Sequence, residues 1–217
     1  MKKKLVTLLA CAMIGASVLS GCGGSANTEV PEESVAATIT VEDESLPPLD
    51  ADLQELYAEA YKIYNQISFG KFDYDEETTI EKDGFEYYKI TDSRFKTYDD
   101  FQSYLEQYFT KDFVANGILG EGNIMFAKGE DGGLYFLGGG RGSNIFYAGH
   151  VFEMDRETEK EIDFKATAYY TNSNEAYDGE YFYTAPENPD DYTTQEFHFI
   201  LLKEDGAWKF DDFALFF

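Results

Sequence analysis

The chain of 217 residues is poor in cysteine and histidine, and this shortage excludes several kinds of site. It has two cysteines, Cys11 and Cys22, and two histidines, His150 and His198, in no spacing typical of a zinc site. It also lacks a Gly-x-Ser-x-Gly motif, so there is little material for a nucleophile with its base. We therefore expect no catalytic residues, no metal site and no cofactor, and predict that the protein is not an enzyme.

The chain is also short of positive charge, with 17 Lys and Arg against 42 Asp and Glu. Phosphate groups repel such a chain, so we expect no nucleic-acid partner. Three acidic clusters lie at predicted turns, over 73–77, 155–161 and 187–191, and none has the ligand spacing of a calcium loop. These clusters favour electrostatic docking onto a basic surface over catalysis.

No apolar run in the chain reaches the roughly 20 residues that a bilayer-spanning helix needs. The apolar segment from Leu5 to Leu19 follows three lysines and ends in the run Val18-Leu19-Ser20-Gly21-Cys22, which has the form of a lipobox. This order of charged, apolar and small residues is that of an export signal. We predict that residues 1–21 are a lipoprotein signal peptide. Cys22 is then the lipid attachment site that anchors the protein to the extracytoplasmic face of the membrane.

Cleavage of residues 1–21 removes three lysines and no acidic residue, so the net charge of the mature chain is 14 − 42 = −28. Cleavage also removes Cys11. Because the thiol of Cys22 would carry the lipid, we expect no disulfide. From Gly23 to Leu49 the chain has no Lys, Arg or aromatic residue. That composition does not support a core, and we predict that residues 22–49 form an acidic disordered tether, up to about 90 Å long when fully extended.

Residues 50–217 are predicted to form a single α+β domain that begins with two or three helices. Asp52 is the expected cap of the first helix, and Gly70 its end. Its Leu and Tyr stripe is interpreted as core rather than as a ligand site. Thr97 with Asp100 predicts a second capped helix, and Thr110 a short third one.

A two-residue period predicts antiparallel strands in the rest of the domain. Together with the helices this indicates helices packed on one face of a curved antiparallel sheet. With its Trp-containing last strand, the expected domain resembles NTF2-like and cystatin-like proteins in general shape. The strands are expected near 78–80, 85–90, 123–127, 134–137, 144–155, 161–170, 194–203 and 208–217.

The glycine-rich loop from Gly138 to Gly142 lies between two predicted strands. A phosphate loop leads instead into a helix, so we interpret this one as a wide turn. Arg141 within it is a lone basic residue, either a partner contact or a solvated loop arginine. His150 falls in phase with apolar neighbours and is expected to point inward, whereas His198 is expected to face solvent.

Several short motifs of the domain form a recognisable set. They are Asp83-Gly84-Phe85-Glu86-Tyr87-Tyr88-Lys89-Ile90, Asp92, Phe95, Thr97, the segment Asp100 to Leu105, Phe109-Thr110, Gly133-Leu134-Tyr135 and Trp208-Lys209-Phe210. In these motifs the chain resembles the bacterial DL-endopeptidase inhibitor family typified by IseA. The resemblance implies a non-enzymatic wall-associated protein that blocks the active-site cleft of peptidoglycan hydrolases of the NlpC/P60 class.

We therefore expect a membrane-anchored inhibitor whose partner is a cell-wall endopeptidase with a basic cleft. The candidate contact residues are Glu130, Asp131, Arg141, Asp155 and Glu157. The alternative is an NTF2-like domain that binds or hydrolyses a small ligand in a pocket near His150, lined by tyrosines. An open pocket there with a second titratable group would favour this alternative.

Overall fold

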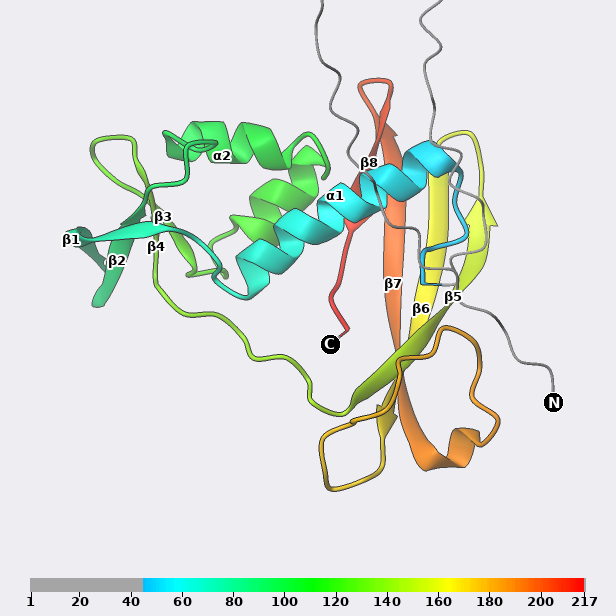
Figure 1. The fold of residues 1–217 in the computed structure, drawn as a ribbon. Helices are drawn as coiled ribbons and strands as arrows, with labels where there is room; N and C mark the ends of the chain where they lie inside the picture. Colours follow the sequence, from blue (N-terminus) through cyan, green and yellow to red (C-terminus); the bar gives the residue numbers. More distant parts are fainter. Residues whose placement is uncertain (1–44, 217) are drawn as a thin grey trace, which may run out of the picture. The chain divides into compact units, whose positions relative to one another are not determined.

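The computed structural model describes residues 45–216 (Figure 1). The predicted signal peptide, Cys22 and the predicted tether up to residue 44 lie outside the described residues. Residues 45–49, which the sequence assigns to the tether, lie against the domain: Leu49 is buried, and the Gln54 side-chain amide donates to the carbonyl of Pro47 at 3.1 Å.

Helix α1 (Ala51–Ser68) carries the first part of the core. Its N-cap is Asp50, whose side chain makes no capping bond, and Asp52 lies in the first turn, so the predicted cap position is wrong. Gly70 ends the helix as predicted, with a φ of 61° that suits glycine. The apolar stripe is confirmed as core, with Tyr57 and Ile63 among its buried members.

Two further helices follow between residues 98 and 118, and a short 3-10 helix, η2 (Pro189–Asp191), lies later in the chain. Helix α2 (Tyr98–Leu105) has the predicted capping box, in which the Thr97 hydroxyl accepts from the Asp100 amide and the Asp100 carboxylate accepts from the Thr97 amide. The π-helix η1 (Phe113–Ile118) follows, and the Thr110 hydroxyl accepts from the Phe113 amide at 3.1 Å. None of the described helices is long and apolar enough to cross a bilayer.

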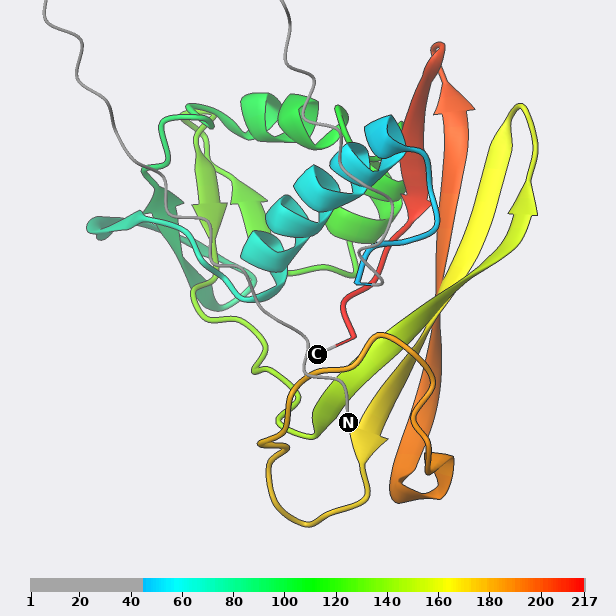
Figure 2. The ribbon, with the colours of Figure 1, turned by 45° about the vertical axis from the view of Figure 1, so that its right-hand side comes forward.

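The strands form two antiparallel sheets of four strands, in the orders β1-β2-β4-β3 and β5-β6-β7-β8. The α+β class is confirmed, but the strands divide between two sheets instead of sharing one (Figures 1 and 2). The strands are β1 (Tyr74–Lys82), β2 (Phe85–Ile90), β3 (Phe126–Lys128), β4 (Leu134–Phe136), β5 (Tyr147–Glu157), β6 (Glu161–Thr171), β7 (Tyr192–Glu204) and β8 (Ala207–Asp212).

The glycine-rich segment after β4 is the reason for this division. It leads the chain away from the first sheet and lies against the end of α1, where the Arg141 amide donates to the Ser68 carbonyl at 3.0 Å. A Cβ on Gly140 would lie 2.2 Å from the carbonyl carbon of Phe69, so only glycine allows this approach. The segment is a connection between sheets rather than a turn within one.

The main core lies between α1 and the sheet β5–β8 (Figure 2). Strand β6 alternates between buried and half-buried residues, as its two-residue period predicts. Phe164 on β6 and Phe199 on β7 face each other across the ladder with stacked rings 4.9 Å apart. The ring of Tyr57 on α1 lies edge-on to both, so the helix closes the core over this sheet.

Two local predictions differ from the structure. The acidic segment 73–77, predicted as a turn, belongs mostly to β1. A bulge between Asp75 and Thr79 bends this strand, and there the Asp75 carboxylate accepts from the Glu77 amide and the Thr78 hydroxyl. The last strand ends at Asp212 instead of continuing to the end. Residues beyond it leave the sheet, and Phe213 and Phe216 are buried in the core.

Candidate functional site

A bulge at the start of β5 places Tyr147 and His150 on the same side of the sheet. Residues three apart in a regular strand point to opposite faces, but the register shifts between Tyr147 and Gly149. Both side chains therefore point toward the core, and the prediction that His150 faces inward is confirmed. His198, on β7, is exposed as expected.

The long loop between β6 and β7 returns to this bulge. Its residue Phe182 forms a bridge with Gly149, the His150 amide donates to the Phe182 carbonyl at 3.0 Å, and the Phe182 amide donates to the Ala148 carbonyl at 3.2 Å. A Cβ on Gly149 would lie 2.0 Å from the Phe182 carbonyl oxygen, so a glycine is required here. This contact places Tyr183 beside His150 and Tyr181 beside Tyr147.

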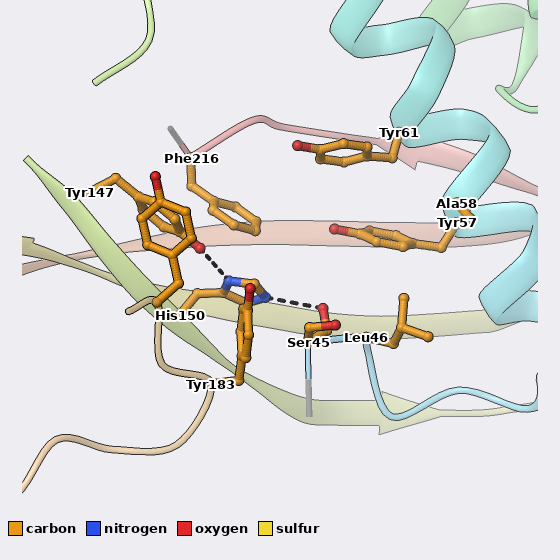
Figure 3. A pocket seen from close by; sticks show the side chains of 10 residues that line it. Ser45, Leu46, Tyr57, Ala58, Tyr61, Tyr147, His150, Tyr183 and Phe216 are labelled. Carbon is orange, nitrogen blue, oxygen red and sulfur yellow. Dashed lines mark hydrogen bonds between the residues drawn. The ribbon is translucent and has the colours of Figure 1, made fainter. Parts of the chain in front are cut away.

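A cavity of about 410 Å³ opens between helix α1, strand β5 and this loop. Figure 3 shows Tyr57 and Tyr61 reaching into it from α1, while Tyr147, His150 and Tyr183 approach from the other side. Among the described residues, none that lines the cavity has a carboxylate, ammonium or guanidinium group. The lining residues are Ser45, Leu46, Tyr57, Ala58, Tyr61, Tyr147, His150, Tyr181, Tyr183 and Phe216.

His150 is held by a hydrogen bond at each ring nitrogen (Figure 3). Its Nε2 lies 3.3 Å from the Ser45 carbonyl oxygen, which only accepts, so Nε2 carries the proton and donates. Its Nδ1, 2.6 Å from the Tyr147 hydroxyl, is then the acceptor. Burial lowers the pKa of His150 to about 4, and the bond to Ser45 opposes this only in part. The imidazole is therefore neutral at pH 7.

Tyr57, Tyr61 and Tyr147, which line the cavity together with His150, are also neutral at pH 7. Burial raises the pKa of Tyr61 to about 12, and it raises the pKa values of Tyr57 and Tyr147 further. A general acid or base works best with a pKa near the working pH, and none of these groups has one. The cavity beside His150 is thus present where the alternative interpretation placed a pocket. The protonation states of its side chains suit binding of a small ligand better than hydrolysis of one.

Two of the predicted contact residues, Glu130 and Asp131, lie in the turn between β3 and β4 and are exposed. The Asp131 carboxylate already accepts from the Lys89 ammonium at 2.6 Å, the Gly133 amide at 2.9 Å and the Tyr135 hydroxyl at 3.2 Å. These bonds hold the turn to the sheet and lower the pKa of Asp131, with the Lys89 bond as the largest cause. Asp131 has a structural role, whereas Glu130 extends into solvent.

Arg141 is the third predicted contact residue, and it is exposed while also contacting the fold. Its backbone is bonded to the end of α1, its guanidinium lies 5.6 Å from the centre of the Phe69 ring, and it donates to the Leu215 carbonyl at 3.4 Å. The side chain thereby connects the glycine-rich segment to the carboxyl-terminal segment.

Asp155 and Glu157 are exposed on β5, an edge strand of the second sheet, so the predicted contacts occupy three separate places. Asp155, Asp163 and His198 place one possible ligand atom each within 4.8 Å of one another. Neighbouring exposed carboxylates are expected in a chain with 42 acids, and this cluster alone does not make a metal site.

Comparison with known proteins identifies one family. The family described as IseA DL-endopeptidase inhibitor matches residues 49–214, which span every described helix and strand. No curated protein matches the chain.

Proposed function

Because the chain belongs to the IseA DL-endopeptidase inhibitor family, we propose that it is a lipid-anchored, extracytoplasmic inhibitor of cell-wall endopeptidases of the NlpC/P60 type. The observation that carries the proposal is the family match over 49–214. The lipobox ending at Cys22 supports placement on the outer face of the membrane, where wall hydrolases act.

Charge supports a partner with a basic cleft. The mature chain carries 14 − 42 = −28 formal charges, so its field attracts a positively charged surface and speeds association. The exposed carboxylates of Glu130 and Glu157 are candidate contacts for such a surface. Salt screens charges beyond about 8 Å at physiological ionic strength, so the proposed binding weakens as salt is added.

The test is inhibition of a purified NlpC/P60 endopeptidase from the same cell. The mature chain, with Cys22→Ser to keep it in solution, is added to an assay of cell-wall hydrolysis at low and high salt. We expect the hydrolysis rate to fall as the concentration of the mature chain approaches that of the endopeptidase. Inhibition should be weaker at high salt. Absence of both binding and inhibition at about 1 μM, a binding free energy near −8 kcal/mol, would refute the proposal.

Charge reversal at single positions locates the contact surface. Glu130→Lys is expected to weaken inhibition severalfold through slower association. The matched control is Glu121→Lys, an exposed glutamate in the turn between η1 and β3. Equal effects of the two changes would assign the attraction to total charge instead of to the β3–β4 turn.

A further inference from the structure

We infer that the cavity in front of His150 binds a neutral carbohydrate, one or two sugar rings in size. This binding site goes beyond the proposed inhibition of an endopeptidase, and sugar binding is measured separately from inhibition. The cavity of about 410 Å³ lies within the range of roughly 300–1,000 Å³ that is usual for small-ligand sites.

The Tyr57 hydroxyl is the first observation that points to a ligand. Tyr57 is 5 % exposed, and its hydroxyl makes no hydrogen bond to any residue of the described part of the chain. Among the described residues, every fully buried side-chain oxygen has a hydrogen-bond partner. Since the Tyr57 oxygen has none, it is not fully buried and must be accessible from the cavity. Figure 3 shows the phenol directed into the pocket. A buried polar group of this kind needs a partner that enters from outside, either water or a ligand.

The absence of charge decides which ligands fit. The lining groups among residues 45–216 are phenols, a phenyl ring, a neutral imidazole and small or aliphatic residues. A phosphate, a carboxylate or a metal ion entering here would lose its hydration without meeting an opposite charge. The ligand must therefore be neutral.

The lining distinguishes a sugar from a lipid chain. Aromatic side chains dominate the walls, and His150 itself stands between the rings of Phe152, Tyr183 and Phe216, with centroids 4.6, 5.2 and 4.5 Å away. Flat aromatic faces suit the C–H faces of a sugar ring, while the hydroxyls of Tyr57 and its neighbours suit the sugar hydroxyls. A lipid chain would leave the Tyr57 hydroxyl without a hydrogen bond, which makes it the poorer occupant.

An entrance is available beside the loop that returns to β5. Tyr181, at 57 % exposure, lines the cavity and lies with its ring 5.2 Å from that of Tyr147. A ring at this position is accessible from solvent and continues the aromatic wall outward, as a surface that receives a sugar requires.

The test is a titration of the mature chain, carrying Cys22→Ser, with N,N′-diacetylchitobiose and with maltose. Binding is measured by calorimetry and by NMR of the tyrosine rings and His150. We expect saturable binding of at least one of the two sugars, with shifts at the cavity residues. Tyr57→Phe is expected to weaken binding about 5-fold, the equivalent of one hydrogen bond, while the melting temperature stays equal or rises.

Tyr64→Phe is the matched control, because Tyr64 lies on the same helix and does not line this cavity. It should leave sugar binding unchanged. The inference is overturned if neither sugar binds up to about 10 mM, or if Tyr57→Phe leaves the affinity intact. Tighter binding of a long-chain alcohol than of either sugar would also overturn it. So would NMR contacts that show residues 23–44 of the chain itself filling the cavity in the absence of sugar.

Discussion

His150 shows how a single residue couples the pocket to the stability of the fold. Its ring is 5 % exposed and donates to the carbonyl of Ser45, the first described residue of the chain. The same ring accepts from Tyr147 on its own strand. Protonation would place a charge in this aromatic surrounding and remove the acceptor that Tyr147 uses.

We predict that stability falls as the pH drops from about 6.5 to about 4. In this window the unfolded chain binds a proton at His150 and the folded chain does not, since its pKa is lowered to about 4. The free energy of unfolding should be about 2 kcal/mol lower at pH 5 than at pH 7 from this group alone. Urea unfolding at the two pH values measures it.

His150→Gln should flatten this part of the stability curve, whereas His198→Gln at the exposed position should retain it. If the pH dependence of stability is unchanged in His150→Gln, the loss of stability at low pH comes from the carboxylates instead.

Tyr57 shows that one side chain can serve both the core and a cavity. Its position in the apolar stripe of α1 predicts burial, and its ring does contact Phe164 and Phe199. The hydroxyl at its tip nonetheless reaches the cavity, which helical periodicity does not predict. Periodicity reports the direction of a side chain from the helix, whereas the cavity depends on where the loop at 181–183 packs.

At the scale of elements, the candidate site depends on a bulge and a loop. The bulge at Gly149 directs Tyr147 and His150 to one side, and the segment around Phe182 fits against the glycine. The only sequence signal for this contact was the run Tyr181-Phe182-Tyr183, an apolar patch in a loop otherwise rich in Asn, Pro and acids. Such a run is ambiguous, because it does not specify the strand with which it pairs.

Gly149→Ala is predicted to displace segment 181–183 from β5. The new Cβ would lie 2.0 Å from the Phe182 carbonyl oxygen, and overpacking of this kind costs about 1–3 kcal/mol. Hydrogen exchange of the His150 amide, which donates to that oxygen, should become faster while the ladder between β6 and β7 stays protected.

Gly142→Ala is the control for this substitution, because a Cβ there would have no heavy atom within 4 Å. Equal exchange at His150 in Gly149→Ala and in the unaltered protein would show that the loop does not depend on the glycine.

The elements themselves were predictable to different degrees. The α2 cap rests on Thr97 and Asp100, three residues apart, and was predicted from sequence alone. The division into two sheets was not, because pairing of β2 with β4 and separation of β4 from β5 depend on contacts between distant residues. The glycine-rich segment has the composition of a turn and also of a connection that approaches a helix closely, and only packing against α1 distinguishes them.

At the scale of the whole molecule, charge and the predicted anchor determine where the proposed inhibitor works. Because residues 45–49 lie against the domain, a tether of residues 22–44 would limit the domain to about 80 Å from the membrane. Two or more acyl chains would make the attachment firm, and one would make it reversible.

Cys22→Ser is expected to release the protein from the membrane fraction. The thiol is the proposed acyl acceptor, and each buried methylene of an acyl chain contributes about 0.8 kcal/mol to membrane binding. Fractionation of cells, with mass spectrometry of the amino-terminal peptide, measures the result. Ser20→Ala, which keeps a small residue before the cysteine, is the control and should retain the anchor. An unmodified Cys22 in the amino-terminal peptide of the unaltered protein would refute lipid attachment at this residue.

The sequence by itself determined the α+β class, the capped second helix, the inward His150 and the family resemblance, because each depends on local patterns. Only the tertiary structure decided that the strands form two sheets, that Asp131 and Arg141 serve the fold, and that Tyr57 meets His150 at a cavity. These features join residues far apart in the chain. Composition and period specify which side of an element is buried, but they do not specify what packs against it.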